Sequence, residues 1–161
     1  MVFCTAVSSF KGAARRLELL GSNNSLTVYK DFAHSPSKLK ATIAAVKEQF
    51  SKRELIACME LHTFSSLNEN FLTEYRDTMN AADEAIVYFN PHTAEHKKLK
   101  PVTEEQVKSS FGRKDLFVFT DSSVLKDYLL QKNYPKSVLL MMSSGNYDGI
   151  NLEEFAKELL D

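Results

Sequence analysis

The sequence predicts an α/β domain, in which a β-sheet is covered on both faces by helices and begins with an amino-terminal β-hairpin. Short apolar, β-rich runs alternate along the chain with amphipathic helical segments. The 161 residues suit one domain with a substantial core. Hydrophobic residues make up 43% of the chain, with only five Gly and four Pro, so disordered, collagen-like and linker-rich chains are excluded.

Six segments have the pattern of strands. They are Leu17–Leu20, Leu26–Tyr29, Leu55–Leu61, Glu84–Phe89, Leu116–Thr120 and Val138–Met142. The first two flank a five-residue turn, which predicts a hairpin centred on Asn23. In that register Arg16 lies opposite Lys30, and Arg15 lies opposite Asp31.

Helices are expected between these strands. Apolar residues repeat at helical spacing in the first two, as Leu39, Ile43, Val46 and Phe50 in one and as Leu67, Phe71, Tyr75 and Met79 in the other. Ser35 is a candidate cap for the first helix, with Pro36 at its first position. Three further helices are expected in Thr103–Phe111, where Thr103 and Gln106 can form a capping box, and after Asp121 and Asn151.

Two polar segments are assigned no function. Asn90-Pro91-His92 is predicted to be a turn. The basic run His96–Lys100 is predicted to be a solvated loop within the longest irregular connection.

Composition excludes several classes of protein. Twenty Lys and Arg residues against 21 Asp and Glu residues give a net charge of −1, so neither nucleic acid nor an anionic membrane is an expected partner. No apolar run approaches the roughly 20 residues that span a bilayer. Cys4 and Cys58 lack the spacing of a disulfide framework or a metal site, which fits the reducing cytoplasm. The first ten residues lack a signal-peptide pattern, and we expect them to be the cut end of a longer protein.

Two nucleotide-binding motifs and one signalling class are also excluded. The chain contains no Gly-Lys dipeptide and therefore no Walker A loop, and it has no GxGxxG fingerprint. A receiver domain would need a phosphoacceptor Asp after a central strand, and the run Ala57–Leu61 offers none.

Ligands of open α/β sheets bind at the carboxyl ends of the strands. The strand Leu26–Tyr29 leads into Asp31 and His34 just before a helix begins, which places a carboxylate and an imidazole near a helix N-terminus. This segment is a candidate nucleotide corner. An Arg–Asp ion pair with a purely structural histidine is the alternative.

Two further polar loops follow strands and could line the same cleft. One is Glu60–Ser66, which contains His62 and Ser65, and the other is Ser143–Gly149, which contains Ser144 and Asn146. Taken singly, His62 is equally explained as a loop hydrogen-bonding residue. No Ser/His/Asp arrangement follows from these residues.

Two motifs carry a resemblance to a known family. The segment Phe10–Glu18 contains an Arg-x-Glu strand, and Val28–Pro36 contains an Asp-Phe-Ala-His-x-Pro loop. In this order and separation they resemble the carboxy-terminal domain of Mur ligases, and the similarity extends over essentially the whole chain. The resemblance implies a Rossmann-like three-layer sandwich with a mostly parallel sheet.

The resemblance also implies a function. Mur ligases have a UDP-sugar domain, a central P-loop domain and a final domain that closes over ATP, which would explain the missing Walker A loop. ATP converts a muramoyl carboxylate to an acyl phosphate, and an incoming amine then forms an amide. Catalytic residues are therefore not expected within this fragment alone, and the ligands of the accompanying Mg²⁺ are expected mostly in the central domain.

The resemblance also implies roles for individual residues of this chain. Arg16 matches the arginine that approaches the ATP phosphates, Asp31 the acid that accepts ribose hydrogen bonds, and His34 the neighbouring nucleotide contact. His62, Ser65, Ser144 and Asn146 lie in segments that face the incoming amine. Ser35 and Lys30 depart from the family pattern, where a second histidine and a second aspartate are frequent.

The sequence looks most like the branch that joins a murein tripeptide to UDP-N-acetylmuramate. A UDP-N-acetylmuramate–L-alanine ligase and a free-standing nucleotide-binding module are the alternatives.

Overall fold

The computed structural model describes residues 17–63 and 65–161. A six-stranded sheet with the order β1-β2-β6-β3-β4-β5 forms its centre. The strands are β1 (Glu18–Ser22), β2 (Leu26–Asp31), β3 (Glu54–Glu60), β4 (Glu84–Tyr88), β5 (Phe117–Phe119) and β6 (Ser137–Met142). All neighbouring strands are parallel except β1 and β2. The predicted mostly parallel sheet with an amino-terminal hairpin is therefore confirmed.

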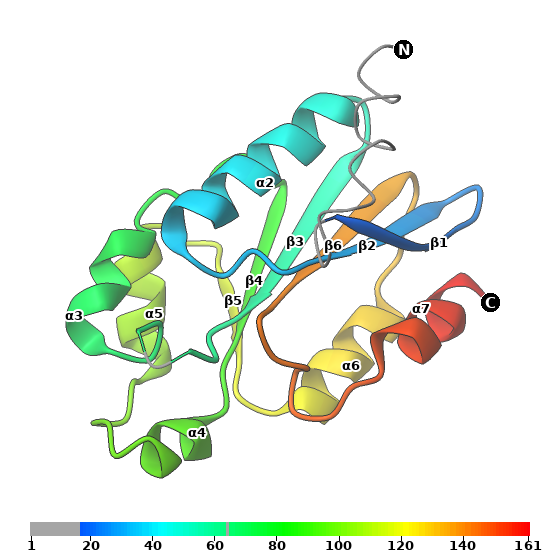
Figure 1. Ribbon diagram of the computed structural model, residues 1–161. Helices are drawn as coiled ribbons and strands as arrows, with labels where there is room; N and C mark the ends of the chain where they lie inside the picture. Colours follow the sequence, from blue (N-terminus) through cyan, green and yellow to red (C-terminus); the bar gives the residue numbers. More distant parts are fainter. Residues whose placement is uncertain (1–16, 64) are drawn as a thin grey trace.

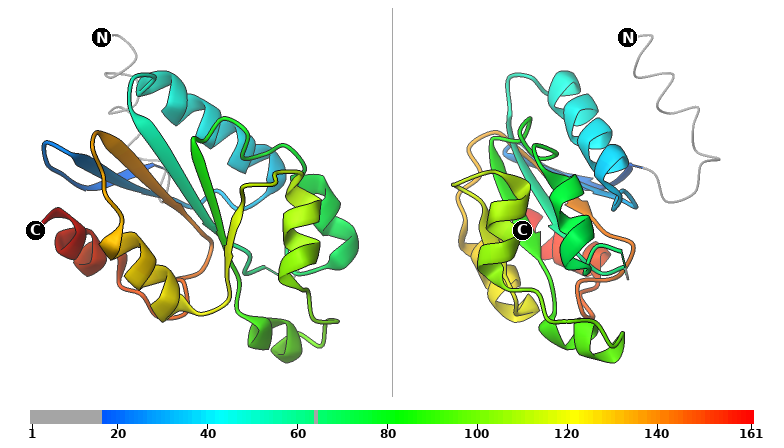
Figure 2. Two further views of the ribbon diagram at one scale, coloured as in Figure 1. Left: turned by 180° about the vertical axis from the view of Figure 1, so that it is seen from behind. Right: turned by 90° about the vertical axis from the view of Figure 1, so that its left-hand side faces the viewer.

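Helices cover both faces of this sheet (Figures 1 and 2). One layer contains α2 (Pro36–Gln49), α3 (Glu69–Leu72), the 3₁₀ helix η2 (Thr73–Tyr75) and α5 (Glu104–Phe111), and the other contains α6 (Ser122–Gln131) and α7 (Leu152–Leu160). Successive side chains of a strand point to opposite faces, so Met59 of β3 packs in the α2 layer and Cys58 in the α6–α7 layer. Because β3 and β6 are covered on both faces, every residue from Leu55 to Glu60 is buried.

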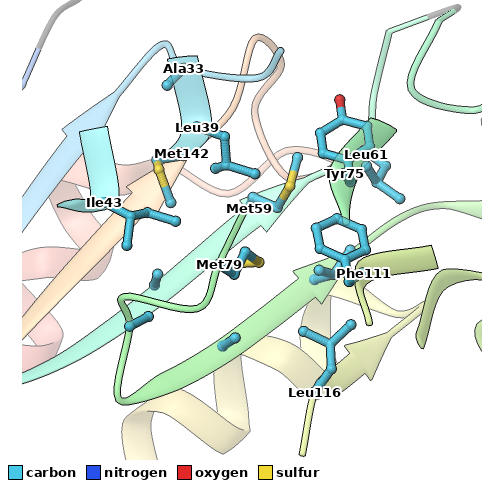
Figure 3. Close-up of a cluster of buried hydrophobic side chains, with 14 of the residues drawn as sticks. Ala33, Leu39, Ile43, Met59, Leu61, Tyr75, Met79, Phe111, Leu116 and Met142 are labelled. Atoms are coloured by element: carbon cyan, nitrogen blue, oxygen red, sulfur yellow. The ribbon is translucent and has the colours of Figure 1, made fainter. Parts of the chain in front are cut away.

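The α2 layer holds the larger cluster of buried side chains (Figure 3). Met59 and Met142 from adjacent strands lie near Leu39 of α2. Tyr75 and Phe111 stack with ring centroids 5.1 Å apart and an interplanar angle of 18°. This packing fixes the segment after β3 against the sheet.

The expected helix starts are confirmed at four places. Thr103 and Gln106 form the capping box of α5, while Asp121 and Asn151 accept backbone hydrogen bonds at the starts of α6 and α7. Ser35 precedes α2, but its backbone carbonyl, rather than its side chain, accepts the first bond, from Leu39.

The prediction of one continuous helix through Leu67 and Met79 is wrong. Asn68 caps the one-turn helix α3, η2 follows it, and Arg76 leaves the helical conformation. Asp77 then has a φ of 63°, and its N–H donates to the carbonyl of Phe111. The apolar residues at i+4 spacing therefore pack against α5 without forming one continuous helix.

The predicted hairpin register is also wrong. The side chain of Asn23 accepts hydrogen bonds from the N–H groups of Ser25 and Leu26, which moves the turn centre towards the next residue. Next to the turn, Ser22 pairs with Thr27, and a bulge between Leu19 and Gly21 then moves the register back by one residue, so Glu18 pairs with Lys30. Arg15 and Arg16, the predicted partners across the hairpin, lie outside the described residues.

The segment after β4 contains a short helix that the sequence analysis assigned to a turn. Asn90 caps α4 (Pro91–His96) by accepting a hydrogen bond from the N–H of His92. The predicted loop His96–Lys100 is wrong at His96, which ends α4, whereas residues 97–100 lie in a turn and a loop as predicted. Lys100 forms an exposed ion pair with Glu69 at 3.5 Å.

Candidate functional site

Strand register brings three polar segments to one edge of the sheet. Met142, the last residue of β6, aligns with Asp31 of β2 on one side and with Met59 of β3 on the other. The N–H of Ser143 donates to the backbone carbonyl of Asp31 at 3.1 Å. Because β6 returns between β2 and β3, the loops after these three strands meet although they are far apart in sequence.

Asp31 is the last residue of β2 at this edge. Its Oδ2 accepts a hydrogen bond from the N–H of Leu17 and its Oδ1 accepts one from Ala33, both at 2.7 Å. These two bonds therefore help to fix the backbone of the loop that follows β2. A carboxylate has about four acceptor positions, so it keeps capacity for ligand hydroxyls.

Two hollows lie beside Asp31. The first, of about 470 Å³, is lined by Asp31 together with Glu18, Lys30, Phe32, Met141, Ser143, Ser144, Gly145, Asn146 and residues 150–153. The second, of about 440 Å³, lies beside the first turns of α2 and includes Ser37 and Lys38. Asp31 is thus shared by both hollows, next to the N-terminus of a 14-residue helix.

His34 is held in place by the same loop. Its Nδ1 lies 2.9 Å from the carbonyl of Phe32, and its backbone carbonyl accepts a 2.5 Å hydrogen bond from the hydroxyl of Tyr75. Burial raises the pKa of Tyr75 above its usual range, which keeps this hydroxyl protonated as a donor. With Nδ1 used internally, Nε2 is the ring nitrogen of His34 that remains for a ligand.

Lys30 lies at the mouth of the first hollow between two carboxylates. Its Nζ is 2.6 Å from Glu153 and 3.5 Å from Glu18. The hydrogen bond with Glu153, and the negative charge of Glu18, raise the pKa of Lys30. The same hydrogen bond lowers the pKa of Glu153. Lys30 thereby joins the hairpin to the first turn of α7.

The four residues expected to face an amine are only partly brought together. Ser144 and Asn146 line the first hollow, and among the described residues the buried Oγ of Ser144 has no hydrogen-bond partner. His62 lies against Gly145 of the same loop. Ser65 is exposed and does not line this hollow. Arg16 lies outside the described residues.

Glu60 is the site residue that the sequence analysis missed. Only 3% of its side chain is exposed, although it is acidic. Its Oε1 accepts hydrogen bonds from the hydroxyl of Ser143 at 2.5 Å and from the N–H of Tyr147 at 2.9 Å. The available signal was one acidic residue ending an otherwise apolar buried strand, Leu55–Met59.

Within residues 17–63 and 65–161, no three His, Cys, Asp or Glu side chains gather in a way that could hold a metal ion. In the same part of the chain, no helix has both the length and the apolar character needed to cross a membrane.

Comparison with known proteins gives one family and two kinds of ligase. The family model "Mur ligase, glutamate ligase domain" matches residues 15–145. The chain is 30% identical over 154 residues to a UDP-N-acetylmuramate–L-alanine ligase of Microcystis aeruginosa, a match that covers 92% of the chain and 32% of that protein. The chain spans between about a fifth and a third of the length of the curated relatives it matches.

Two solved structures have a similar fold. One is a domain described as part of a UDP-N-acetylmuramate:L-alanyl-γ-D-glutamyl-meso-diaminopimelate ligase of Haemophilus ducreyi, with 25% identity, a TM-score of 0.60, and coverage of 89% of this chain and 99% of that one. The other is a murein peptide ligase of Psychrobacter arcticus, with 22% identity, a TM-score of 0.70, and coverage of 98% of this chain and 32% of that one.

Proposed function

The chain belongs to the Mur ligase family as its carboxy-terminal domain, and from this premise we propose that it closes over ATP in a peptidoglycan-precursor ligase. In this reaction the carboxylate of UDP-N-acetylmuramate takes a phosphoryl group from ATP and leaves ADP. The amine of the incoming substrate then attacks the acyl phosphate, an amide forms, and inorganic phosphate departs.

The observation that carries this proposal is the position of Asp31. Its carboxylate lies between two hollows, at the carboxyl ends of parallel strands and beside the start of α2. This is the place where open α/β sheets bind nucleotides. Asp31 would accept hydrogen bonds from the ribose hydroxyls, and His34 would offer Nε2 to the nucleotide. Arg16 would approach the phosphates, a role suited to its permanent charge.

Mg²⁺ would accompany the ATP and offset the charge of its phosphates. The described residues contain no cluster of acidic, His or Cys side chains suited to this ion. We propose that its ligands lie mostly in the central domain, which also holds the P-loop, and that the UDP-sugar site lies in a further domain of the enzyme. Those domains are the partners of this chain, and the reaction is proposed to occur in the cytoplasm.

We propose a murein tripeptide as the incoming amine. His62, Ser144 and Asn146 offer imidazole, hydroxyl and amide groups near the cleft, and Ser65 adds a hydroxyl further along the same loop as His62. Several separate polar groups suit the carbonyls and carboxylates of a peptide better than one methyl side chain. The peptide ligase described for the Haemophilus ducreyi domain supports this substrate.

L-Alanine is the second candidate, because the relative of Microcystis aeruginosa is named an L-alanine ligase. A competition assay with the full-length enzyme separates the two. UDP-N-acetylmuramate and ATP are supplied with L-alanine and the tripeptide at equal concentrations, and product masses are read. Mainly tripeptide product is expected, whereas exclusive alanyl product would assign the enzyme to the alanine-adding branch.

Replacement of Asp31 by Ala tests the nucleotide site. In the full-length enzyme, Asp31→Ala is expected to raise KM for ATP by about tenfold, the effect of removing interactions worth about 1.4 kcal/mol. Loss of the bonds to Leu17 and Ala33 is expected to lower the free energy of unfolding by about 1–3 kcal/mol, measured by urea denaturation. Asp127→Ala, on the exposed side of α6, is the control. An unchanged KM for ATP with reduced stability would leave Asp31 with a structural role alone.

A further inference from the structure

Glu60 is a buried acidic residue at the place where the loop after β3 meets the loop after β6. It ends β3 beside β6, and its Oε1 is occupied by donors from the loop after β6, Ser143 and Tyr147. Burial of a carboxylate is unfavourable unless hydrogen bonds or an opposite charge compensate for lost hydration. Two short bonds satisfy only one of its two oxygens.

The second oxygen faces His62. Oε2 of Glu60 lies 3.8 Å from Nδ1 of His62, whose side chain is 41% exposed. This distance exceeds that of a hydrogen bond. A small ring rotation or one bridging water would complete the interaction. Glu60 thus contacts the loop after β6 with one oxygen and faces the loop after β3 with the other.

Gly145 limits where the imidazole can lie. A Cβ atom at this position would lie 2.8 Å from Cγ of His62 and 2.9 Å from Oε1 of Glu60. Such distances are shorter than real Cβ contacts, so a larger residue would displace the ring or the carboxylate. The imidazole is therefore set between a buried carboxylate and a backbone that approaches closely.

We propose that Glu60 is a positioning residue that fixes the tautomer and orientation of His62 for the incoming amine. Nδ1–H points to the carboxylate, so Nε2 keeps its lone pair and faces outward. A neutral Nε2 accepts a hydrogen bond from the N–H of an amino acid or peptide amine. The substrate part of this inference rests on the proposed ligase function, whereas the arrangement of Glu60 and His62 does not.

Glu60→Gln separates this role from a structural one. The amide oxygen of Gln can still accept from Ser143 and Tyr147, and the side chain fills the same volume. Its NH₂ group then faces His62 and donates to Nδ1, which requires the proton to move to Nε2. Glu48→Gln, on the exposed face of α2, removes the same charge without touching His62 and is the matched control.

The tautomer is measured in this chain, without substrates, by ¹⁵N NMR of the His62 ring at about pH 9, where imidazole side chains are neutral. The Nδ1–H form is expected to dominate in the wild type and in Glu48→Gln. The Nε2–H form is expected in Glu60→Gln. The same tautomer in all three proteins would overturn the proposal.

The consequence for substrate is measured in the full-length enzyme. Glu60→Gln is expected to raise KM for the amine by about tenfold, the effect of losing one hydrogen bond of about 1.4 kcal/mol. KM for ATP should be unchanged. In a His62→Gln background, Glu60→Gln should have no further effect on KM for the amine, because residues that act as a unit are not additive.

Additive effects in this double-mutant cycle would show that Glu60 does not act through His62, and would overturn the substrate part of the proposal. If the wild-type enzyme joins neither L-alanine nor the tripeptide, the proposed function fails, and the NMR experiment still decides the role of Glu60.

Discussion

Lys30 is a residue whose charge is used within the fold. A lysine beside the candidate nucleotide corner could attract phosphate. The structure places its Nζ between Glu153 and Glu18, and these two carboxylates give the trio a net negative charge. We infer that Lys30 stabilises the contact between the hairpin and α7.

Glu153→Gln tests this interaction through pH. The pKa of Glu153 is lowered in the folded state, so the pair adds stability above the unfolded pKa of about 4.5 and loses it as pH falls through the folded pKa. Because Glu153 is more than half exposed, we expect a loss of only about 0.2–1 kcal/mol at pH 7. Urea unfolding at neutral and strongly acidic pH measures it, with Glu48→Gln as the control. A difference that persists in strong acid would contradict an ion-pair origin.

The loop after β6 is the element on which the candidate site depends most. Tyr147, Asp148 and Gly149 have φ values of 53°, 59° and 98° in succession, of which only Gly adopts its value without strain. Tyr147 is buried, and its hydroxyl lies 2.8 Å from the carbonyl of Met142 and 3.0 Å from that of Cys58. Buried packing and hydrogen bonding therefore hold the loop in an unusual backbone conformation.

Tyr147→Phe is expected to lower the free energy of unfolding by about 1–3 kcal/mol, because the one hydroxyl proton shared by two buried carbonyls is lost while the ring volume is kept. Amide hydrogen exchange should rise in residues 143–149. Tyr134→Phe, which removes a hydroxyl bonded to Leu129 elsewhere in the same layer, should destabilise the chain without raising exchange in this loop. Unchanged exchange in Tyr147→Phe would assign the loop conformation to the backbone alone.

At the scale of the whole molecule, two helical layers pack on a six-stranded sheet and form the core of the described residues. The Haemophilus ducreyi structure is a domain of nearly the same extent. The described residues contain the hollow beside Asp31, and the sequence contains no Walker A loop, so in the proposed function the rest of the ATP site lies in another domain. We therefore expect this chain to fold by itself but to have no catalytic activity by itself.

We expect the chain by itself to unfold in one cooperative transition and to hydrolyse no ATP. Thermal unfolding followed by circular dichroism and a phosphate-release assay measure the two properties. Weak ATP binding is compatible with half a cleft, because part of the contacts remains. ATP turnover by the purified chain would contradict the proposal that the phosphate loop lies in another domain.

The sequence by itself determined the local features of the fold. Apolar periodicity and capping residues such as Thr103, Asp121 and Asn151 placed three helices, and uninterrupted apolar runs placed β3 and β6, because these signals act between residues close in the chain. The family motif around Asp31 and His34 was also local. The end of the helix after Tyr75 could not be predicted, because contact with Phe111 competes there with local periodicity.

Tertiary structure alone decided which loops meet. Glu60 could not be recognised from spacing, since its partners Ser143 and Tyr147 lie more than 80 positions away and approach only because β6 inserts beside β3. The hairpin register likewise depended on the hydrogen bonds that Asn23 accepts in the turn and on a bulge in β1, which has no reliable sequence signal. Local free energies select helices and strands, whereas the order of strands in the sheet determines which polar side chains share one site.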